Sequence, residues 1–568
     1  MEKRWVIKER PDDKVVQDLA QQLNINQSLA SLLVQRDIRS FESAKSFFRP
    51  KLSDLHDPFL MKDMDVAVNR LIEAVSLQER ILIYGDYDVD GTTSVALVYS
   101  FLHRFSDNIE YYIPDRYKEG YGVSYQGVEY AAATDVSLII ALDCGIKALD
   151  TVEQAKKYGI DFIICDHHRP GEKLPVALAV LDPKRDDCGY PFKELSGCGV
   201  GFKLLQGFCL QNTIDEAELF SLIDLVAVSI ASDIVPIVGE NRVIAYYGLK
   251  KLNARPIAGL KSLIDIAGVR RPIDISNIVF QLGPRINAAG RLSHAKESVK
   301  LLVSDDPEEL LSFSNRLNTT NLDRREFDSN MTREALEIIE GNESLKSAKS
   351  TVLFKDSWHK GVIGIVASRC TEHYYRPTII LTKSRDKATG SARSVEGFDI
   401  YNAIDQCADL LDQYGGHTHA AGLTLPIEKI EDFRQRFEEV VAATIAPEAL
   451  TPKLDIDLSV PLRFASFKTL GILNQMRPFG PHNMHPVFIS EKVIIKSPPH
   501  IMKERHAKLY LSEDNNSSIY EAVGWGMAEL ALKIPLNSPF RVAYTIEENT
   551  YQGNKTIQLN IKDIKFYD

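Results

Sequence analysis

Short apolar runs between residues 76 and 240 alternate with longer stretches that favour helix. The runs, which we expect to be strands, cover 80–84, 109–113, 137–142, 161–165 and 177–181. Strands that alternate with helices are typical of a parallel, doubly wound α/β sheet. The carboxyl ends of such strands meet at one edge of the sheet, where open α/β folds bind their ligands.

Acidic and histidine residues follow three of these runs, and a helical stretch from Glu216 to Ala231 ends near a further aspartate. The residues are Asp86, Asp88, Asp90, Asp143, Asp166, His167, His168 and Asp233. Three carboxylates in one loop repel one another unless a cation lies among them. Oxygen ligands with one or two imidazoles and no thiolate favour Mn²⁺ or Mg²⁺ over a structural zinc ion. Two such ions about 4 Å apart are a recurrent arrangement for the hydrolysis of phosphate esters.

Simpler interpretations exist for each piece. A single aspartate at a strand end is more often a helix cap than a ligand. An EF-hand calcium loop would explain Asp-x-Asp-x-Asp-Gly91, but its final glutamate is missing and the flanks are not paired helices. The glycines of Gly197-Cys-Gly-Val-Gly201 precede no Lys-Ser/Thr pair, so they indicate tight packing and not a Walker A loop.

The chain resembles the DHH phosphoesterase superfamily and, within it, the RecJ family of bacterial single-stranded-DNA exonucleases. Eight motifs and the amino-terminal segments Leu32–Arg36 and Asp57–Asp63 carry this resemblance over nearly the whole chain. The motifs are Gly85–Gly91, Asp143–Gly145, Asp166–His168, Asp224–Asp233, Gly283–Leu292, His359–Ala367, Ser391–Ser394 and Gly415–Gly422.

The resemblance implies roles for the residues at matching positions. Metal ligands would be Asp86, Asp88, Asp90, Asp143, His167 and Asp233, holding two Mn²⁺ or Mg²⁺ ions, with Asp143 bridging them. His168 would touch the scissile phosphate, and the catalytic set would comprise His168, Asp143 and Asp166. The activity it implies is a metal-dependent exodeoxyribonuclease of DNA repair and recombination, which degrades single strands from 5′ to 3′ and releases 5′-mononucleotides.

A second set of residues is expected to grip the nucleic acid from a domain that faces the metal site across a cleft. Guanidinium groups pair with phosphate in a fork, and glycines let the backbone approach a phosphate closely. The candidates are Arg285, Asn287 and Arg291 in a glycine-bounded loop, with Arg393, Ser394, Gly415, Gly416 and His417. Trp525 is a further candidate contact, although barrel core is an equally good interpretation of it.

The organisation we expect is a doubly wound DHH domain, a long helix, a smaller α/β DHH-associated domain and an all-β OB fold. The segments are a leader at 1–75, packed on the main domain, followed by 76–305, 306–345, 346–446 and 452–568. The smaller domain should contain strands 350–354 and 377–382 with helices 361–370 and 399–413. Barrel strands are expected at 456–460, 491–496, 507–511, 519–525, 540–546 and 556–566.

Composition limits the partners and the compartment. The chain carries a net charge of −11, so a nucleic-acid site must be a local basic groove. No apolar run is long enough to span a bilayer, and Met1–Trp5 lacks the apolar core of a signal sequence. The 7 cysteines show no C-x-x-C pair. These features predict a cytoplasmic protein. We expect a monomer that acts on single-stranded DNA, with a single-strand-binding protein and a RecQ-type helicase as partners implied by the resemblance.

Three other functions are consistent with parts of the sequence. A DHH phosphatase or short-oligonucleotide hydrolase would share the acidic cluster but usually lacks the leader and residues 451–568. A catalytically inactive replication scaffold would have lost metal-binding acids, which are all present here. A simple single-strand-binding protein would use the barrel alone.

Overall fold

The structure is a computed structural model that describes residues 2–514 and 518–567. The chain divides into two compact units. The larger unit contains residues 5–283, 299–310 and 454–568, and the smaller unit contains residues 1–4, 284–298 and 311–453. Within the described ranges, none of the helices combines the length and the hydropathy that a bilayer crossing requires.

A parallel five-stranded sheet forms the centre of the α/β part of the larger unit, in the order β3-β2-β4-β5-β6. The strands are β2 (Ile81–Gly85), β3 (Ile109–Tyr112), β4 (Leu138–Leu142), β5 (Asp161–Cys165) and β6 (Ala179–Leu181). They coincide with the five runs predicted from the sequence. Their residues are almost all buried because helices cover both faces of the sheet, as expected for parallel strands.

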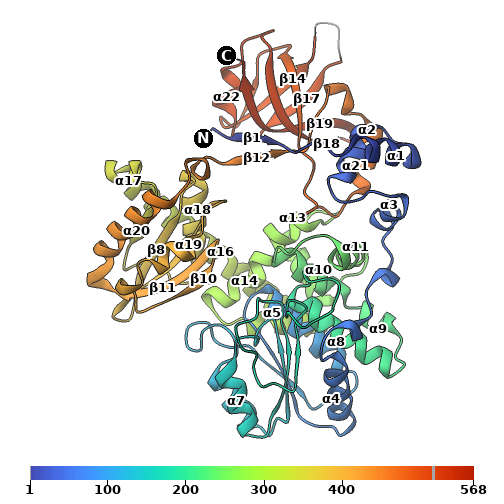
Figure 1. The fold of residues 1–568 in the computed structure, drawn as a ribbon, viewed down its shortest axis with the longest axis vertical. Coiled ribbons are helices and arrows are strands. Elements are labelled where there is room, and N and C mark those ends of the chain that lie inside the picture. Colours follow the sequence, from blue (N-terminus) through green and yellow to red (C-terminus); the bar gives the residue numbers. More distant parts are fainter. Residues whose placement is uncertain (1, 515–517, 568) are drawn as a thin grey trace. The chain divides into compact units, whose positions relative to one another are not determined.

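Helices lie on both sides of the sheet (Figure 1). Successive side chains of a strand point to opposite faces, so each face packs against its own group of helices. Leu82 and Tyr84 point to the face covered by α6 (Tyr125–Ala133) and α7 (Leu149–Lys157). The opposite face carries α4 (Met64–Ser76), α5 (Val89–Leu102) and α8 (Gly197–Gln211). The helices that follow are α9 (Glu216–Phe220), α10 (Ile223–Ser232), α11 (Gly239–Ala254) and α12 (Ala258–Ala267). The doubly wound prediction is confirmed.

The sequence predicted that the leader packs on the α/β domain, but its first helices pack on the carboxyl-terminal barrel. Its first helices are α1 (Asp13–Leu23), α2 (Gln27–Val34) and α3 (Phe41–Phe48), preceded by β1 (Arg4–Ile7). Leu19, Leu32 and Leu33 belong to the hydrophobic core of the carboxyl-terminal barrel. An amphipathic pattern shows that one helix face is buried, but it does not identify the surface that covers it.

The rest of the leader contacts the α/β domain. Two short 3₁₀ helices, η1 (Leu52–Asp54) and η2 (Pro58–Leu60), lead into α4. Here the buried Nζ of Lys203 on α8 contacts the carbonyl oxygen of His56, 2.5 Å away, and Glu240 of α11, 3.2 Å away. The Asp57–Asp63 segment is therefore fixed to the helix whose first turn reaches the acidic cluster.

The carboxyl-terminal part is a closed β structure with the sheet order β13-β14-β18-β19-β17-β16-β15 and a further pairing between β14 and β16. Its strands are β13 (Leu458–Ser459), β14 (Phe488–Ile495), β15 (His500–Met502), β16 (His506–Ser512), β17 (Tyr520–Gly524), β18 (Phe540–Tyr551) and β19 (Asn554–Phe566). Strand β12 (Lys453–Ile456) pairs with β1, outside the barrel. Helices α21 (Phe467–Gln475) and α22 (Ala528–Leu532) complete it. The all-β prediction is confirmed, although β15 and both helices were not predicted.

The smaller unit contains a mixed five-stranded sheet in the order β10-β11-β9-β8-β7. The strands are β7 (Thr351–Phe354), β8 (Thr378–Ser384), β9 (Lys387–Arg393), β10 (Gln413–His417) and β11 (Ala420–Pro426). Only β7 and β8 are parallel; β9, β10 and β11 form an antiparallel meander that the sequence did not predict. Helix α18 (Ile363–Tyr374) lies on one face, with α19 (Ile400–Asp405) and α20 (Ile430–Thr444) on the other.

Two predictions about helices need correction. The predicted helix 399–413 ends at Asp405, since residues 408–410 form a separate 3₁₀ turn, η4 (Ala408–Leu410), and β10 begins at Gln413. The expected loop Gly283–Leu292 is helix α14 (Gly283–Leu292), which continues from α13 (Ile275–Asn277) and a π-helical turn, η3 (Ile278–Leu282). Pro284 lies just after the π-helical turn, and the helical segment continues through it.

The long connecting helix is confirmed as α16 (Pro307–Glu340). It follows α15 (Lys296–Val303) and precedes α17 (Glu343–Ser347). Met331, Ala335 and Ile339 on its carboxyl-terminal half pack against Val362 and Val366 of the smaller unit. The remaining short helices are η5 (Ile427–Lys429), η6 (Pro447–Leu450) and η7 (Leu462–Phe464).

Candidate metal centre

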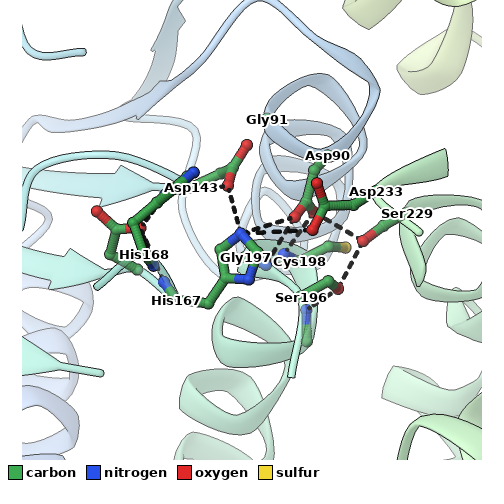
Figure 2. A network of polar contacts seen from close by, with 12 residues as sticks. Asp90, Gly91, Asp143, His167, His168, Ser196, Gly197, Cys198, Ser229 and Asp233 are labelled. Atoms are coloured by element: carbon green, nitrogen blue, oxygen red, sulfur yellow. Dashed lines mark hydrogen bonds and ion pairs between the residues drawn. The ribbon is translucent and has the colours of Figure 1, made fainter. Parts of the chain in front are cut away.

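The acidic residues lie where the neighbouring strands β2, β4 and β5 end. Asp86, Asp143 and Asp166 each follow the last residue of one of these strands directly. Helix α10 ends at Ser232, and Asp233 is its C-cap residue. The structure thus brings all eight acids and histidines of the predicted cluster to one edge of the sheet. Figure 2 shows Asp90, Asp143, His167, His168 and Asp233 among them.

Asp88 and Asp90 are placed by the start of helix α5. Asp88 caps this helix and accepts a hydrogen bond from the backbone N–H of Gly91 at 3.0 Å. Asp90, in the first turn, is 1% exposed and accepts hydrogen bonds from the N–H groups of Gly197 and Cys198 at 2.7 and 2.8 Å. The hydroxyl of Ser229 donates to Asp90 at 2.7 Å, and Ser196 lies 2.6 Å from that hydroxyl.

The glycine segment at the start of α8 is tightly packed, as predicted, and it also has a role that the sequence did not reveal. A Cβ atom on Gly197 would lie 2.6 Å from the Cβ of Asp143. A side chain at this position would therefore push the first turn of α8 away from the acidic cluster. Gly91 is equally constrained, because its Cβ would come within 2.3 Å of the backbone oxygen of Asp86.

His167 lies among three carboxylates. Its Nε2 atom is 3.3 Å from Oδ1 of Asp143, 3.5 Å from Asp233 and 3.7 Å from Asp90 (Figure 2). The side chain is buried, yet neither ring nitrogen has a hydrogen-bond partner among the described residues. The same is true of Oδ1 of Asp86 and Oδ1 of Asp143. Buried polar atoms almost always have a partner, so a missing ligand is the natural explanation.

Three overlapping groups of side chains could each hold an ion. In each group, one ligand atom per residue lies within 4.8 Å of the others. The groups are Asp86–Asp88–Asp143, Asp90–His167–Asp233 and Asp143–His167–His168. Asp143 and His167 each belong to two of them. Oxygen atoms with one or two imidazoles fit Mn²⁺ or Mg²⁺, so these residues match the predicted pair of ions.

The electrostatics of the cluster also require a cation. Burial and the neighbouring charges of Asp90 and Asp88 raise the pKa of Asp143 well above its usual range. Burial and Asp88 do the same to the pKa of Asp86, while burial and Asp90 raise that of Asp88. The pKa of Asp233 is raised to about 8 by burial and by Asp90. The cluster cannot keep all its negative charge near neutral pH without a compensating ion.

Asp166 and His168 form a separate pair at the side of the cluster. Asp166 accepts hydrogen bonds from the N–H groups of Ile146, His167 and His168, and its Oδ1 lies 2.7 Å from Nδ1 of His168. Burial would raise the pKa of Asp166, but the hydrogen bond and charge of His168 outweigh it and lower the pKa to about 2. Burial would lower the pKa of His168, but Asp166 raises it to about 9. Asp166 therefore orients His168.

Sequence reasoning missed Asp182, a further acid near this edge. It follows β6 directly and is 0% exposed. Its carboxylate accepts a hydrogen bond from the N–H of Lys184 at 2.7 Å, and burial raises its pKa to about 7. The rule that located Asp143 and Asp166 would have located Asp182, because residues 177–181 were predicted to be a strand.

Asp224, in contrast, is not part of the cluster. Its Oδ2 atom pairs with Lys251 at 2.9 Å and accepts a hydrogen bond from the N–H of Ile257. The first residue of the Asp224–Asp233 motif therefore connects α10 to α11 and α12.

The predicted phosphate ligands of Gly283–Leu292 lie on helix α14. Arg285 donates to Oδ1 of Asn318 at 3.0 Å, and Arg291 donates to the carbonyl oxygen of Gly361 at 3.2 Å. Asn287 lies on the same helix and is half-buried. Burial, with the charges of Arg325 and Arg324, lowers the pKa of Arg285. Three clustered guanidinium groups favour the approach of an anion.

The other predicted phosphate ligands lie on the antiparallel meander. The register aligns Arg393, Ala420 and His417 in one row across β9, β11 and β10. Gly416 has a φ of +154°, and a Cβ there would lie 2.4 Å from the carbonyl oxygen of Ala420, so only glycine fits. Nothing lies within 4 Å of a Cβ placed on Gly415. Arg393 and His417 therefore lie in the same row of residues across the sheet.

Arg393 also lies over the first turn of helix α18. A Cβ on Gly364 would be 3.0 Å from the Nη2 atom of Arg393. Arg393 donates to Oγ of Ser391 at 3.0 Å, while the hydroxyl of Ser394 turns away and donates to the carbonyl oxygen of Phe398. A guanidinium beside a helix amino terminus is a favourable place for a phosphate.

Trp525 is a surface residue of the barrel. Its side chain is 59% exposed, and its ring lies 5.0 Å from that of His506. The barrel-core interpretation of Trp525 is wrong, since the core of this domain excludes it.

Comparison with known proteins identifies the class to which this fold and site belong. The model of the DHH family N-terminal domain matches residues 80–230, and that of the DHHA1 domain matches residues 347–443. The RecJ OB domain matches residues 456–563. The fold and the acidic cluster therefore define a DHH-family protein with a DHHA1 and an OB domain.

The relatives narrow this class. The chain is 39% identical to the single-stranded-DNA-specific exonuclease RecJ of Bacillus subtilis (strain 168), over 99% of this chain and 70% of that protein. It is 31% identical to the RecJ of Escherichia coli (strain K12), over 89% of this chain and 90% of that one. The chain belongs to the RecJ family.

Solved structures of RecJ also match the fold of this chain. The chain matches RecJ of Thermus thermophilus in complex with Mn²⁺ with a TM-score of 0.86 and 26% identity, covering 100% of this chain and 80% of that one. The Mg²⁺ complex of the same protein gives a TM-score of 0.80 and 25% identity, covering 100% and 79%.

Proposed function

We propose that this chain is a Mn²⁺- or Mg²⁺-dependent exonuclease that degrades single-stranded DNA from its 5′ end and releases 5′-mononucleotides. The observation that carries the proposal is the overlap of three ligand groups on Asp143 and His167, with buried donor atoms that lack partners among the described residues. Membership of the RecJ family supports the substrate class and the polarity, and with them a role in DNA repair and recombination.

The proposed ligands of the two ions are Asp86, Asp88, Asp90, Asp143, His167 and Asp233. When bound, divalent cations supply a hydroxide nucleophile near neutral pH and offset the charge that develops on the phosphate. Asp143 is the best candidate for a shared ligand because it belongs to two groups and lies at the end of the central strand β4. His167 is the other shared residue, because it belongs to the groups Asp90–His167–Asp233 and Asp143–His167–His168.

The other residues of the site act on the substrate. Asp166 holds Nδ1 of His168, which leaves Nε2, beside the Tyr121 hydroxyl, as the ring nitrogen that would donate to a phosphate oxygen. Neutralising a non-bridging oxygen in this way stabilises the transition state of phosphoryl transfer. Arg285, Asn287, Arg291, Arg393, Ser394, Gly415, Gly416 and His417 are proposed to bind the DNA backbone, and Trp525 to stack on a base.

The proposal includes action as a monomer. It also includes the predicted domain limits, which are 1–75, 76–305, 306–345, 346–446 and 452–568. We also propose a cytoplasmic location, supported by seven cysteines that are all buried and unpaired. A single-strand-binding protein and a RecQ-type helicase are proposed partners, because a single-strand nuclease needs a source of unpaired DNA.

The test compares a long single strand with a dinucleotide as substrates for the purified protein, with Mn²⁺, with Mg²⁺ and with EDTA. We expect metal-dependent degradation of the long strand, with mononucleotides appearing first from a 5′-terminal label. Preference for the dinucleotide would instead favour a small-substrate phosphatase, and binding without cleavage would favour a scaffold.

The matched variant is Asp143→Asn, which removes one charge and keeps the volume of the side chain. Asparagine suits this position because Asp143 has a φ of +59°, a conformation that asparagine tolerates. We expect cleavage to be lost while the fold and most single-strand binding persist. Asp143→Ala should behave in the same way, and retained nuclease activity in either variant would contradict the bridging role.

A further inference from the structure

Tyr121 contacts His168 from a loop that the proposed mechanism does not use. Its hydroxyl oxygen lies 3.2 Å from Nε2 of His168, and the two rings meet edge to face with centroids 5.9 Å apart. Tyr121 lies between β3 and α6, in a segment that the sequence analysis did not single out. It is nevertheless 59% exposed, so the residue faces solvent beside the metal cluster.

The two ring nitrogens of His168 differ in their partners. Asp166 binds Nδ1 at 2.7 Å, while the Tyr121 hydroxyl lies 3.2 Å from Nε2 and 3.4 Å from Nδ1. A hydroxyl both donates and accepts hydrogen bonds, so the contact with Nε2 persists whether or not that nitrogen carries a proton. Asp166, His168 and Tyr121 thus form a chain of polar groups that ends on an exposed hydroxyl.

The loop that carries Tyr121 is braced at both ends. The carboxylate of Glu119 accepts hydrogen bonds from the N–H of Asp115, from Oη of Tyr112 and from Oγ of Ser124. The buried hydroxyl of Tyr84 donates to the carbonyl oxygen of Gly122 at 3.0 Å. These contacts hold the segment on the sheet although much of its surface is open to solvent.

The residues on either side of Tyr121 are glycines with positive φ angles. Gly120 and Gly122 have φ values of +89° and +87°, and nothing lies within 4 Å of a Cβ placed on either of them. Glycine at both positions permits backbone rotation at little cost. The ring of Tyr87 lies 6.4 Å from that of Tyr121, in an edge-to-face arrangement. Both glycines are nevertheless held by hydrogen bonds, since the N–H of Gly120 donates to the carbonyl oxygen of Asp115 and the carbonyl oxygen of Gly122 accepts from Tyr84. Tyr121 is therefore presented on a braced loop.

A phosphate oxygen that binds Nε2 of His168 comes close to the Tyr121 hydroxyl, which lies 3.2 Å from that nitrogen. Two outcomes are physically reasonable: the hydroxyl leaves, or it turns its proton toward the incoming oxygen and stays. The second keeps every polar group satisfied, because an oxygen of the phosphate diester accepts hydrogen bonds from both neighbours.

We propose that the Tyr121 hydroxyl donates a hydrogen bond to a non-bridging oxygen of the scissile phosphate, beside His168. The inference rests on the proposed nuclease function and adds a substrate-contacting residue to it. Tyr121 thereby extends the Asp166–His168 pair by one donor that binds no metal. It acts on the phosphate group and not on the bases, so it adds no sequence preference.

The test uses the full chain and the variant Tyr121→Phe, which removes only the hydroxyl of an exposed side chain. The control is Tyr125→Phe at the start of α6, where the tyrosine is 51% exposed. At saturating single-stranded DNA and Mn²⁺, we expect kcat to fall about 10-fold in Tyr121→Phe and to stay unchanged in Tyr125→Phe. Mn²⁺ affinity, measured by calorimetry without DNA, should change less than about 2-fold, because the hydroxyl is not a ligand.

A substrate with sulfur in place of one non-bridging oxygen at the scissile linkage separates direct contact from an effect through His168. Sulfur is a poor hydrogen-bond acceptor. One of the two stereoisomers should therefore slow the wild-type protein more than it slows Tyr121→Phe. Equal effects of both stereoisomers on both proteins would overturn the proposal, as would an unchanged kcat or a loss of Mn²⁺ affinity. A wild-type protein that leaves single-stranded DNA intact would overturn the proposed function itself.

Discussion

The backbone N–H of Gly197 lies 2.7 Å from Oδ2 of Asp90, although the two residues are 107 positions apart. Together with Cys198 and Ser229 it gives Asp90 three hydrogen-bond donors. Asp86 and Asp143 each have an oxygen without a partner among the described residues. The carboxylate of Asp90 is therefore oriented before any ion binds, and the first turn of α8 supplies two of the donors that orient it.

Gly197→Ala should weaken metal binding. The new Cβ would lie 2.6 Å from the Cβ of Asp143, so α8 or Asp143 must move. We expect Mn²⁺ affinity to fall about 10-fold or more, with a loss in the free energy of unfolding of about 1–3 kcal/mol from overpacking. Calorimetric titration and urea unfolding measure the two effects. Gly471→Ala is the control: it lies in helix α21 with nothing within 4 Å of its Cβ, so it should be neutral or slightly stabilising.

Ser229→Ala tests the hydrogen bond that orients Asp90. The hydroxyl donates to Asp90 at 2.7 Å and lies 2.6 Å from the hydroxyl of Ser196. Losing an outer-shell partner of a metal ligand typically costs about 10- to 100-fold in affinity, so Mn²⁺ binding should weaken by about 10-fold. Ser490→Ala in the barrel removes an equally buried hydroxyl with two partners, and it should lower stability without changing Mn²⁺ affinity. Equal Mn²⁺ affinities for the two variants would contradict the role of Ser229.

Metal binding should release protons. Without a cation, burial and Asp90 raise the pKa of Asp233 to about 8, and the pKa values of Asp86 and Asp143 are also raised. Below these values the carboxyl groups hold protons that an ion must displace, so Mn²⁺ affinity should rise with pH through the pKa of Asp233, about 8. Calorimetry in two buffers of different ionisation enthalpy counts the protons. An affinity that does not change between about pH 6 and about pH 9 would show that the ligands are already ionised.

The metal centre was predictable because a simple rule locates it. In a parallel sheet, residues after neighbouring strands share one edge, and the apolar runs before Asp86, Asp143 and Asp166 were easy to identify. The donors that orient Asp90 were not predictable. Nothing local distinguishes Ser229, in the middle of an apolar helix, from a serine that simply caps its own backbone. Only the packing of α10 and α8 against α5 brings it to Asp90.

The meander of the smaller unit was missed for a different reason. Residues 387–393 and 413–422 are rich in glycine, alanine and serine, which have low strand propensity, and no strand was predicted there. Their strands are stabilised by pairing with β8 and with each other, which is a tertiary effect. The same limitation applies to the leader, whose apolar positions predicted burial without identifying the barrel as the partner.

Arg393→Ala should weaken single-strand binding and leave metal binding unchanged. Arg393 lies over the first turn of α18, where a guanidinium and backbone N–H groups favour an anion. Losing a charge-assisted hydrogen bond costs about 1.5–3 kcal/mol, so affinity for single-stranded DNA should fall at least about 10-fold, with a smaller salt dependence. Fluorescence anisotropy in the Asp143→Asn background measures binding without cleavage. Arg385→Ala, an exposed arginine in the turn before β9, removes the same charge and should have little effect. A change in Mn²⁺ affinity in Arg393→Ala would contradict the assignment of Arg393 to single-strand binding.

Trp525→Ala should reduce single-strand affinity without destabilising the barrel. The side chain is 59% exposed and outside the hydrophobic core of the domain, so stability should change by less than about 0.5 kcal/mol. A tryptophan in the core would instead cost about 3–5 kcal/mol on truncation. Stacking of one base on an aromatic ring contributes about 1–3 kcal/mol, which predicts a loss of about 10-fold in affinity for a long single strand. Leu532→Ala removes another exposed apolar side chain of this domain and should leave DNA binding unchanged. Equal affinities for Trp525→Ala and the unaltered protein would exclude this ring from the DNA path.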